Sequence, residues 1–276
     1  MRFVGGHVSI AGGLPNATTN TLKIGGNCMQ IFAGSPRLWF RKPFSETEVS
    51  SFLKGNLENN IGPVFIHGLY LVNLATNNQD LLEKSVNSLV ADLNNGSQIR
   101  SEGVIFHIGS HQGRGFDEVK DQLVASIQRI LDLTKDTNLI LENDAGQNGK
   151  IGSIEELSYL KEKINSNRIK ICLDTAHLFE SGVDLRNQHK INLFIEQLKE
   201  LKIIDDVVCI HLNDSATDLD SHRDMHANLG EGKIGLEGLS FFINTKELKN
   251  LPLILEVPGD DRQGPNRHNI NIAKEL

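Results

Sequence analysis

Hydrophobic positions along the chain follow two alternating patterns. Short runs rich in β-branched and other apolar residues predict strands at 3–9, 28–33, 64–68, 103–109, 139–143, 169–174, 207–214 and 252–257. Between them lie longer segments whose apolar residues recur every three or four positions, and the clearest of these predict helices at 81–93, 118–134 and 191–202. Eight strands alternating with helices are typical of a closed parallel barrel.

The alternation runs from one end of the chain to the other without a Pro/Ser-rich linker or a low-complexity segment. We therefore predict an α/β protein with a single (β/α)8 TIM-barrel domain over residues 1–276 and its active site at the C-terminal ends of the strands. A doubly wound open sheet is the structural alternative. No GxGxxG motif follows the first predicted strand, which argues against a dinucleotide-binding sheet.

Composition places the chain among ordinary globular proteins, with 39% hydrophobic and 23% charged residues. No uncharged apolar run reaches about 18 residues, and the N-terminus lacks a basic region followed by an apolar stretch. We therefore predict a cytoplasmic protein without a membrane partner. Cys28, Cys172 and Cys209 each lie in an apolar run, which predicts buried thiols of a reducing compartment.

The formal net charge of -7 argues mildly against a protein that coats nucleic acid through bulk positive charge. That objection weakens if several carboxylates neutralise bound metal ions. The charge then has to be judged at the site, with the cations included.

Metal-competent or ionisable residues occupy the ends of nearly all the predicted strands. They are His7, His67, His107, Glu142, Asp174, His211 and Glu256. In a barrel these ends converge on one mouth. A lone histidine on an apolar strand is more often an ordinary core or surface residue, but the same placement on strand after strand indicates a site.

Two local motifs add further candidates. In the motif Asp174-Thr-Ala-His177 a turn after the strand can direct the carboxylate and the imidazole to one cluster. In the motif Asp224-Met-His226 an extended loop can present both ligands on one side, although a solvated polar loop would look the same.

Apart from His7, the combined set holds five imidazoles and four carboxylates, more than a single metal ion uses. Ligation by His and carboxylate without thiolate indicates zinc, manganese or iron. Several such ions close together suit phosphoryl chemistry, so the residues themselves predict metal-assisted phosphoester hydrolysis.

Seven segments resemble motifs of the endonuclease IV family of apurinic/apyrimidinic endonucleases, in the family's order and over essentially the whole chain. The segments are GGHVSIAGGL, VFIHGLYLVNLA, FHIGSH, LILENDAGQ, ICLDTAH, IHLNDS with DMHANLGEGKIG, and PLILE.

The resemblance implies a trinuclear zinc site, with Mn²⁺ in part as an alternative. In it His67, His107 and Glu142 hold one ion, and Glu142 bridges to a second ion bound also by Asp174, His211 and Glu256. The third ion has His177, Asp224 and His226 as ligands. Glu142 and Glu256 are also the implied catalytic residues, because they flank the hydroxide that attacks the phosphate 5′ to an abasic sugar. The implied products are a 3′-hydroxyl and a 5′-deoxyribose phosphate.

The resemblance further implies double-stranded DNA with abasic sites as the partner of a monomeric enzyme. Tyr70 and Leu71 match residues that wedge into the base stack, and Arg37 matches an arginine that enters the duplex. Further basic residues on segments leaving the strand ends are weaker candidates for phosphate contacts: Arg41, Lys42, Arg114, Arg223, Lys233 and Arg262.

Three positions depart from the family pattern. Ala176 stands where the family often has Cys, Ala216 where it has Lys, and Met225 where it has Arg. None of the three is a predicted zinc ligand. The departures put one or two phosphate contacts in doubt, and with them the strength of binding to DNA.

Two other functions fit part of the pattern. Glu142, Asp174, His211 and Glu256 alone resemble the single divalent-metal site of sugar isomerases and epimerases with xylose-isomerase-like barrels. A non-catalytic binder of damaged DNA would keep the barrel and the wedge residues, although carboxylates without metal would repel one another.

Overall fold

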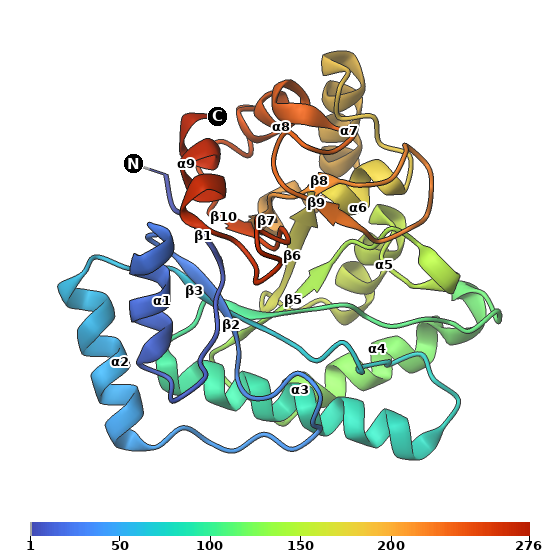
Figure 1. The fold of residues 1–276 in the computed structure, drawn as a ribbon. Coiled ribbons are helices and arrows are strands. Elements are labelled where there is room, and N and C mark those ends of the chain that lie inside the picture. The colour runs from blue at the N-terminus through green and yellow to red at the C-terminus, as the bar shows by residue number, and fades with distance from the viewer. Residues whose placement is uncertain (1) are drawn as a thin grey trace.

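The computed structural model describes residues 2–276, so Met1, the first residue of the predicted domain, lies outside the described residues. Eight parallel strands form a closed barrel in the order β1-β10-β7-β6-β5-β4-β3-β2 (Figure 1). They are β1 (Val4–His7), β2 (Met29–Phe32), β3 (Val64–His67), β4 (Gly103–Phe106), β5 (Asn138–Glu142), β6 (Ile169–Asp174), β7 (Val207–His211) and β10 (Leu253–Leu255). The predicted (β/α)8 barrel is confirmed.

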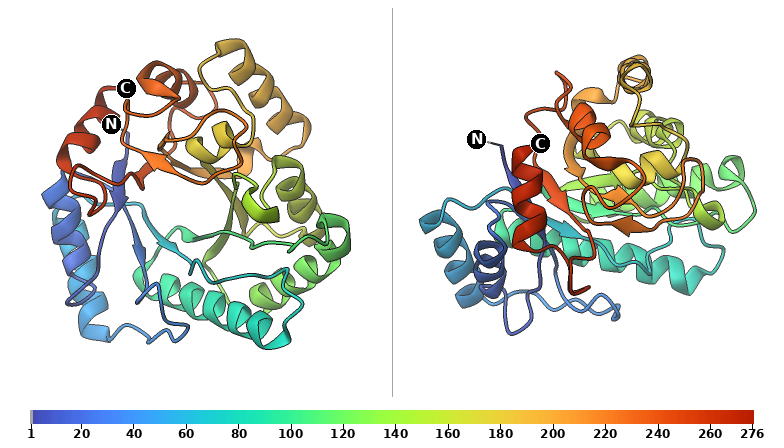
Figure 2. Two further views of the ribbon diagram at one scale, coloured as in Figure 1. Left: turned by 45° about the vertical axis from the view of Figure 1, so that its right-hand side comes forward. Right: turned by 45° about the horizontal axis from the view of Figure 1, so that its top comes forward.

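Helices surround the barrel on its outside, and the C-terminal helix packs beside β1 (Figure 2). The helices are α1 (Asn16–Ile24), α2 (Glu46–Glu58), α3 (Gln79–Ile99), α4 (Phe116–Asp132), α5 (Ile154–Ile164), α6 (Thr175–Glu180), α7 (Gln188–Glu200), α8 (Gly235–Ile243) and α9 (Arg267–Glu275), with 3₁₀ turns η1 (Gln147–Gly149) and η2 (Ile204–Asp206). Among residues 2–276, none of the helices combines the length and apolarity needed to span a membrane.

Each predicted strand and each predicted helix overlaps an observed element, with shifts at the ends. The helix predicted at 81–93 extends over 79–99, because the Asn78 side chain caps its start by accepting a hydrogen bond from the Leu81 N–H at 3.0 Å. Several strands end before the predicted limit. His107 and Glu256 each follow the last residue of a strand, where the chain leaves the hydrogen-bonded ladder toward the mouth.

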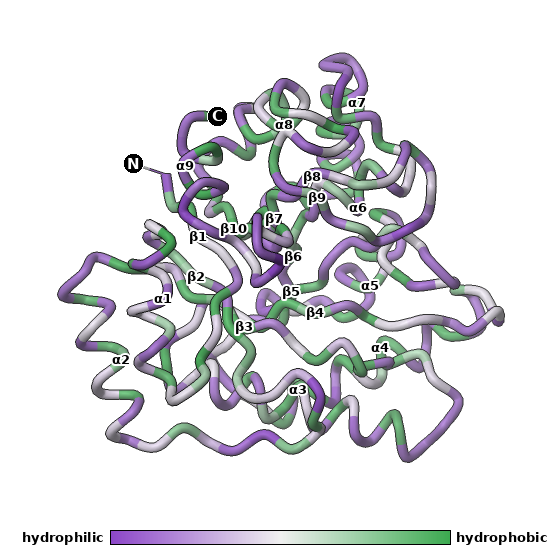
Figure 3. Tube along the Cα trace, viewed as in Figure 1, coloured by the Kyte–Doolittle hydropathy of each residue, from purple (hydrophilic) through white to green (hydrophobic). Residues whose placement is uncertain are grey.

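The hydrophobic core has two parts, one between the barrel and the helices and one inside the barrel. Apolar residues mark the strands, while the loops above them are more polar (Figure 3). The interior part consists of Cys28, Phe65, Ile105, Ile140, Cys172, Cys209 and Ile254. All three cysteines are buried and free of disulfides, as predicted. This dry layer forms the floor under the mouth of the barrel.

The strand predicted at 207–214 is divided, because β7 ends at His211 and Asp214 begins a separate two-stranded antiparallel ribbon. The ribbon consists of β8 (Asp214–Ser215) and β9 (His226–Ala227). The Asp214 carboxylate accepts hydrogen bonds from several backbone N–H groups of the following loop, including that of Gly232 at 3.1 Å. A Cβ on Gly232 would collide with the Asp214 carboxylate, so the loop requires glycine there. Asp214 thereby fixes the segment that carries His226.

Candidate metal centre

All nine predicted metal ligands lie at the mouth of the barrel and form overlapping groups. In the first group, the Nε2 atoms of His67 and His107 face one oxygen of Glu142, at 3.2 and 3.6 Å. His67 ends β3, His107 follows β4 and Glu142 ends β5, so neighbouring strands present the three side chains to one point. Glu142 and His67 are buried, while His107 is partly open to the mouth.

The second group uses the other oxygen of Glu142. This oxygen lies 2.8 Å from Nδ1 of His211, and the same nitrogen is 3.3 Å from Glu256 and 3.8 Å from Asp174. Four ligand atoms of Glu142, Asp174, His211 and Glu256 fall within 4.8 Å of one another. Glu142 therefore faces two groups at once, as a bridging carboxylate does.

The third group combines a helix with the ribbon. Nε2 of His177 lies 3.3 Å from Asp224 and 3.4 Å from Nε2 of His226, and Asp224 and His226 are 3.8 Å apart. Asp174 caps α6 by accepting a hydrogen bond from the His177 N–H at 3.0 Å, which sets the position of the imidazole. The turn expected after Asp174 is thus the first turn of a helix.

These residues fit a cluster of divalent cations. Two ligands at about 2.0–2.1 Å from a tetrahedral ion lie about 3.4 Å apart, close to the separations within each group. The nine donors are oxygens and imidazole nitrogens, which suit zinc or manganese. Three of the carboxylates, those of Glu142, Asp174 and Glu256, converge on one small volume, where cations would offset their mutual repulsion.

The electrostatics of the groups keep Glu142 and Glu256 ionised. Burial acts to raise the pKa of Glu142, but the charges of His107 and His211 outweigh it and hold that pKa well below its usual value. The pKa of Glu256 is likewise lowered, against burial, by the charge of His211. The centre therefore presents ionised oxygen ligands at neutral pH.

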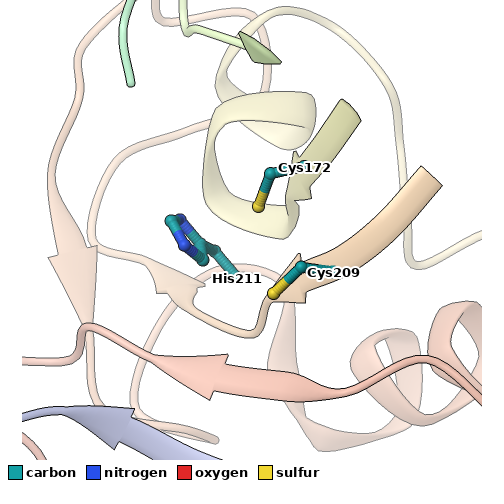
Figure 4. Close-up of side chains that lie close together, drawn as sticks. All are labelled: Cys172, Cys209 and His211. Carbon is teal, nitrogen blue, oxygen red and sulfur yellow. The ribbon is translucent and has the colours of Figure 1, made fainter. Parts of the chain in front are cut away.

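Below His211 lie two thiols, and Figure 4 shows Cys172 and Cys209 on adjacent strands beside the imidazole. Burial raises the pKa of Cys209, which keeps its thiol protonated. Nδ1 of His211 faces the Glu142 carboxylate at 2.8 Å. The thiols thus belong to the floor of the site.

Sequence reasoning missed several polar residues that hold the ligands. Asp144 is buried and its carboxylate lies 3.0 Å from Nδ1 of His107, which orients that ring. Lys150 bridges Asp144 and Asp224, at 3.3 and 3.2 Å. Asp144 follows Glu142 by two residues in LENDAGQ, a signal that could have identified it, whereas the position of Lys150 depends on the loop around η1.

Two buried asparagines support the ligands in a similar way. The Asn213 side chain donates to Asp174 at 2.6 Å and accepts from the Glu256 backbone N–H at 2.8 Å. The backbone carbonyl of Asn143 lies 3.0 Å from Nδ1 of His177 and fixes that ring, and its side-chain oxygen accepts from the Asp174 backbone N–H at 2.6 Å. Nothing in the local sequence pattern distinguishes these asparagines from turn residues.

The predicted DNA contacts lie on the rim of the same mouth. Tyr70 is 64% exposed although its ring contacts the rings of Phe32 and His67, and Leu71 beside it is 45% exposed. Arg37 is exposed on the loop after β2. A cavity of about 620 Å³ lies next to Tyr70 and reaches Glu256 and His7. The rim therefore places apolar and basic groups beside a space that opens onto the candidate metal centre.

One predicted phosphate contact is wrong. Arg41 is buried and its Nε donates to Asp92 at 2.9 Å, with both side chains fully inaccessible. Its Nη1 donates to the backbone carbonyls of Ser35 and Leu38, at 2.7 and 3.1 Å. Arg41 thus anchors the loop that carries Arg37, because its guanidinium pairs with a buried carboxylate instead of facing solvent.

The other weak candidates for phosphate contacts differ in exposure. Arg114 is partly buried and donates to the backbone carbonyls of His111 and Ala75. The remaining four are exposed: Lys42, Arg223, Lys233 and Arg262.

The three departures from the family pattern also differ in exposure. Ala176 is buried, so a side chain there does not face DNA directly, whereas Ala216 and Met225 are exposed. The phosphate contacts that these departures put in doubt are therefore limited to those at the exposed Ala216 and Met225.

Comparisons with known proteins agree with this geometry. Residues 19–276 match the family model described as xylose isomerase-like TIM barrel. Probable endonuclease 4 of Haloquadratum walsbyi is 37% identical over 263 residues, which cover 95% of this chain and 94% of the relative. The structure of endonuclease IV from Thermus thermophilus superposes with a TM-score of 0.86 at 33% identity, covering 99% of this chain and 100% of that one.

A D-tagatose 3-epimerase-like protein also superposes, with a TM-score of 0.69 over 98% of this chain and 94% of that one, but the identity is 18%. That likeness shows the barrel fold alone. The full-length similarity to endonuclease 4 proteins, in contrast, exceeds 30% identity in sequence and structure. The chain belongs to the xylose-isomerase-like TIM barrels and, within them, to the endonuclease IV family.

Proposed function

We propose that the protein is a zinc-dependent apurinic/apyrimidinic endonuclease. It hydrolyses the phosphodiester on the 5′ side of an abasic site in double-stranded DNA and leaves a 3′-hydroxyl and a 5′-deoxyribose phosphate. The observation that carries the proposal is the convergence of nine oxygen and nitrogen ligands at the mouth of a barrel related over its length to endonuclease IV.

In this proposal the three groups of ligands would each hold one zinc ion, with Mn²⁺ as a partial substitute. His67, His107 and Glu142 would hold the first. Glu142 would bridge to the second, with Asp174, His211 and Glu256 as its other ligands, and the third would take His177, Asp224 and His226. Bound zinc would supply Lewis acidity, which activates water at neutral pH and offsets the charge of a phosphate.

Glu142 and Glu256 are the proposed catalytic residues. Glu256 is the ligand that both faces His211 in the second group and lines the cavity beside Tyr70. Its lowered pKa keeps it ionised, so it can accept a hydrogen bond from the attacking water and direct that water toward the phosphate. Glu142 is fully buried and fixes the spacing between the first two groups.

Tyr70, Leu71 and Arg37 are the proposed DNA-binding residues. Unstacking a nucleotide from a duplex requires a few kcal/mol, and a missing base lowers that requirement. The exposed Tyr70 and Leu71 supply apolar surface that can replace the lost stacking. The cavity next to Tyr70 offers room for the displaced sugar at the edge of the metal centre.

The surplus of ligands also favours this function over a single-metal sugar isomerase. Such an enzyme would use Glu142, Asp174, His211 and Glu256. It would leave His67, His107, His177, Asp224 and His226 without a common purpose.

The test is incision of a synthetic duplex that carries one tetrahydrofuran abasic analogue. We expect cutting on the 5′ side, loss of cutting after treatment with a chelator, and recovery with added zinc. Metal analysis should return about three ions per chain. One ion per chain, together with no cutting of the abasic duplex in zinc-replete buffer, would reject the proposal in favour of the sugar enzyme.

A further inference from the structure

Gln30 is a fully buried polar side chain at the mouth, on β2, and it is not one of the nine ligands. Its amide reaches three other side chains. Nε2 lies 2.6 Å from the Glu256 carboxylate and 3.0 Å from Nδ1 of His7. Oε1 lies 2.8 Å from Nε2 of His211. One amide thus connects two of the candidate ligands, Glu256 and His211.

The orientation of this amide follows from its neighbours. An ionised carboxylate accepts hydrogen bonds and does not donate them, so the NH₂ group of Gln30 has to face Glu256. The carbonyl oxygen then has to face His211. Turning the amide over would place its oxygen 2.6 Å from a carboxylate oxygen, which is strongly unfavourable.

This orientation requires a proton on Nε2 of His211, whether or not Nδ1 is also protonated. The Gln30 carbonyl accepts only from an N–H, so Nε2 of His211 is protonated. Nδ1 is left to face Glu142 at 2.8 Å and Glu256 at 3.3 Å. A neutral imidazole protonated on Nε2 has its lone pair on Nδ1, directed into the second group of ligands.

We propose that Gln30 is a positioning residue for the metal centre. It holds His211 in the tautomer that offers Nδ1 to a divalent cation and at the same time fixes the carboxylate of Glu256. This role rests on the proposed function in so far as the centre holds metal. It goes beyond the nine ligands, because it assigns the hydrogen bonds that orient two of them.

His7 completes the arrangement. Gln30 has a second N–H, and Nδ1 of His7 accepts it at 3.0 Å. The His7 ring lies against Phe32, with ring centroids 4.3 Å apart, which limits its rotation. His7 stands at a strand end like the ligands, and this contact gives it a purpose outside their set. All the polar hydrogens of the Gln30 amide are thereby used.

The test compares Gln30→Met with Gln30→Glu. Methionine has a similar length and no comparable hydrogen bonds, so we expect the weakest-held zinc ion of this variant to bind about 10- to 100-fold less tightly. Glutamate keeps an acceptor for His211 but places its second oxygen where Nε2 lay, 2.6 Å from Glu256, so Gln30→Glu should retain the His211 tautomer while it displaces the Glu256 carboxylate. Zinc affinity is measured by competition with a chromophoric chelator, and the tautomer by nitrogen-15 NMR of the imidazoles in the zinc-free protein.

The matched control is Asn56→Leu, which removes another buried amide of the same barrel. Asn56 lies on α2 and its carbonyl accepts from the Thr18 hydroxyl at 2.7 Å, away from the candidate metal centre. We expect this variant to lose stability but to keep the zinc affinity of the unaltered protein. An equal loss of zinc from Asn56→Leu and Gln30→Met would mean that general destabilisation explains both, and would overturn the proposal.

Further outcomes separate this inference from the proposed reaction. If Gln30→Met keeps the zinc affinity and the His211 tautomer of the unaltered protein, the role of Gln30 is overturned even if the unaltered protein cuts abasic DNA. If zinc binding depends on Gln30 but the unaltered protein does not cut abasic DNA, the role of Gln30 is supported and the proposed reaction is rejected. If Gln30→Met fails to fold, the Gln30→Glu variant decides, because loss of the His211 tautomer there contradicts the assigned hydrogen bond.

Discussion

The candidate metal centre and the rim around it share one barrel mouth but differ in burial and in support. Glu142, Asp174 and His211 are fully buried, and neighbouring strands hold each of them from several sides. On the rim, Tyr70 and Leu71 are 64% and 45% exposed. The centre is therefore arranged by the barrel before any ligand binds, whereas the rim gains most of its contacts from a partner.

Because of this difference, substitutions in the candidate metal centre and substitutions on the rim should have different effects. A buried carboxylate that faces two groups has no substitute within the barrel, so its loss affects the whole centre. An exposed rim residue contributes one contact among several, so its loss weakens binding by a limited factor. Four predictions, from the largest expected effect to the smallest, would break or sharpen that contrast.

The largest effect is expected for Glu142→Gln. The amide keeps the volume of the side chain but removes the charge that faces both His67 and His211, so incision should fall by more than about 10³-fold. Circular dichroism should show an intact barrel. Near-normal turnover would contradict the bridging role of Glu142.

Arg41→Met tests whether the anchor of the rim loop behaves as a buried group. Burial raises the pKa of Asp92 to about 7 even beside the Arg41 guanidinium, so removing Arg41 leaves a carboxyl group without its partner. We expect the free energy of unfolding to fall by about 3–5 kcal/mol in urea denaturation.

The salt dependence of DNA binding provides the control for Arg41. A phosphate contact contributes to the slope of log affinity against log salt concentration, and a buried anchor does not. We expect an unchanged slope for Arg41→Met. For the exposed Arg37→Met, unfolding should be unaffected while DNA affinity falls. A reduced slope for Arg41→Met would restore its predicted phosphate contact.

Tyr70→Ala should affect the rim alone. Loss of one stacking side chain should weaken binding to an abasic duplex by about 1–3 kcal/mol, or roughly 5- to 150-fold. Zinc content should not change, because Tyr70 contacts the His67 ring without being one of its hydrogen-bond partners. Fluorescence anisotropy and metal analysis measure the two quantities. Parallel loss of zinc would assign Tyr70 to the centre.

The smallest effect is expected for Glu180→Gln, which tests the anchor of the third group. One Glu180 oxygen accepts from Ser215, from Thr217 and from the Met225 N–H, and so holds the loop that carries Asp224. Burial raises the pKa of Glu180 to about 7, so the folded protein binds a proton that the unfolded chain releases above about 4.5. Stability from this group is therefore lost as the pH rises from about 4.5 to 7.

Glu180→Gln keeps the accepting oxygen and does not titrate. The variant should match the unaltered protein at pH 5 and exceed it by about 1–2 kcal/mol at pH 8 in urea unfolding. A variant that is less stable at both pH values would show that the carboxylate itself is required there.

Sequence patterns predicted the elements and most of the candidate site for a simple reason. Parallel strands in a closed barrel bring their C-terminal ends to one mouth, so residues such as His67 and Glu142 become neighbours whatever their distance along the chain. The local motifs around Asp174 and Asp224 were likewise predicted from the sequence to direct their ligands to this mouth. These ligands are set by their position at the end of a strand, and hydrophobic periodicity predicts where the strands end.

The residues that support the ligands depended on the tertiary structure. Gln30 lies within an apolar run, and Lys150 and Arg41 lie in loops. Each acts through a partner distant in sequence, which is His211, Asp224 and Asp92 respectively. Periodicity does not say which way an amide turns or whether a guanidinium is buried, because these depend on the charges packed around it. The sequence thus determined the barrel and its candidate ligands, and the packing of side chains decided how those ligands are held.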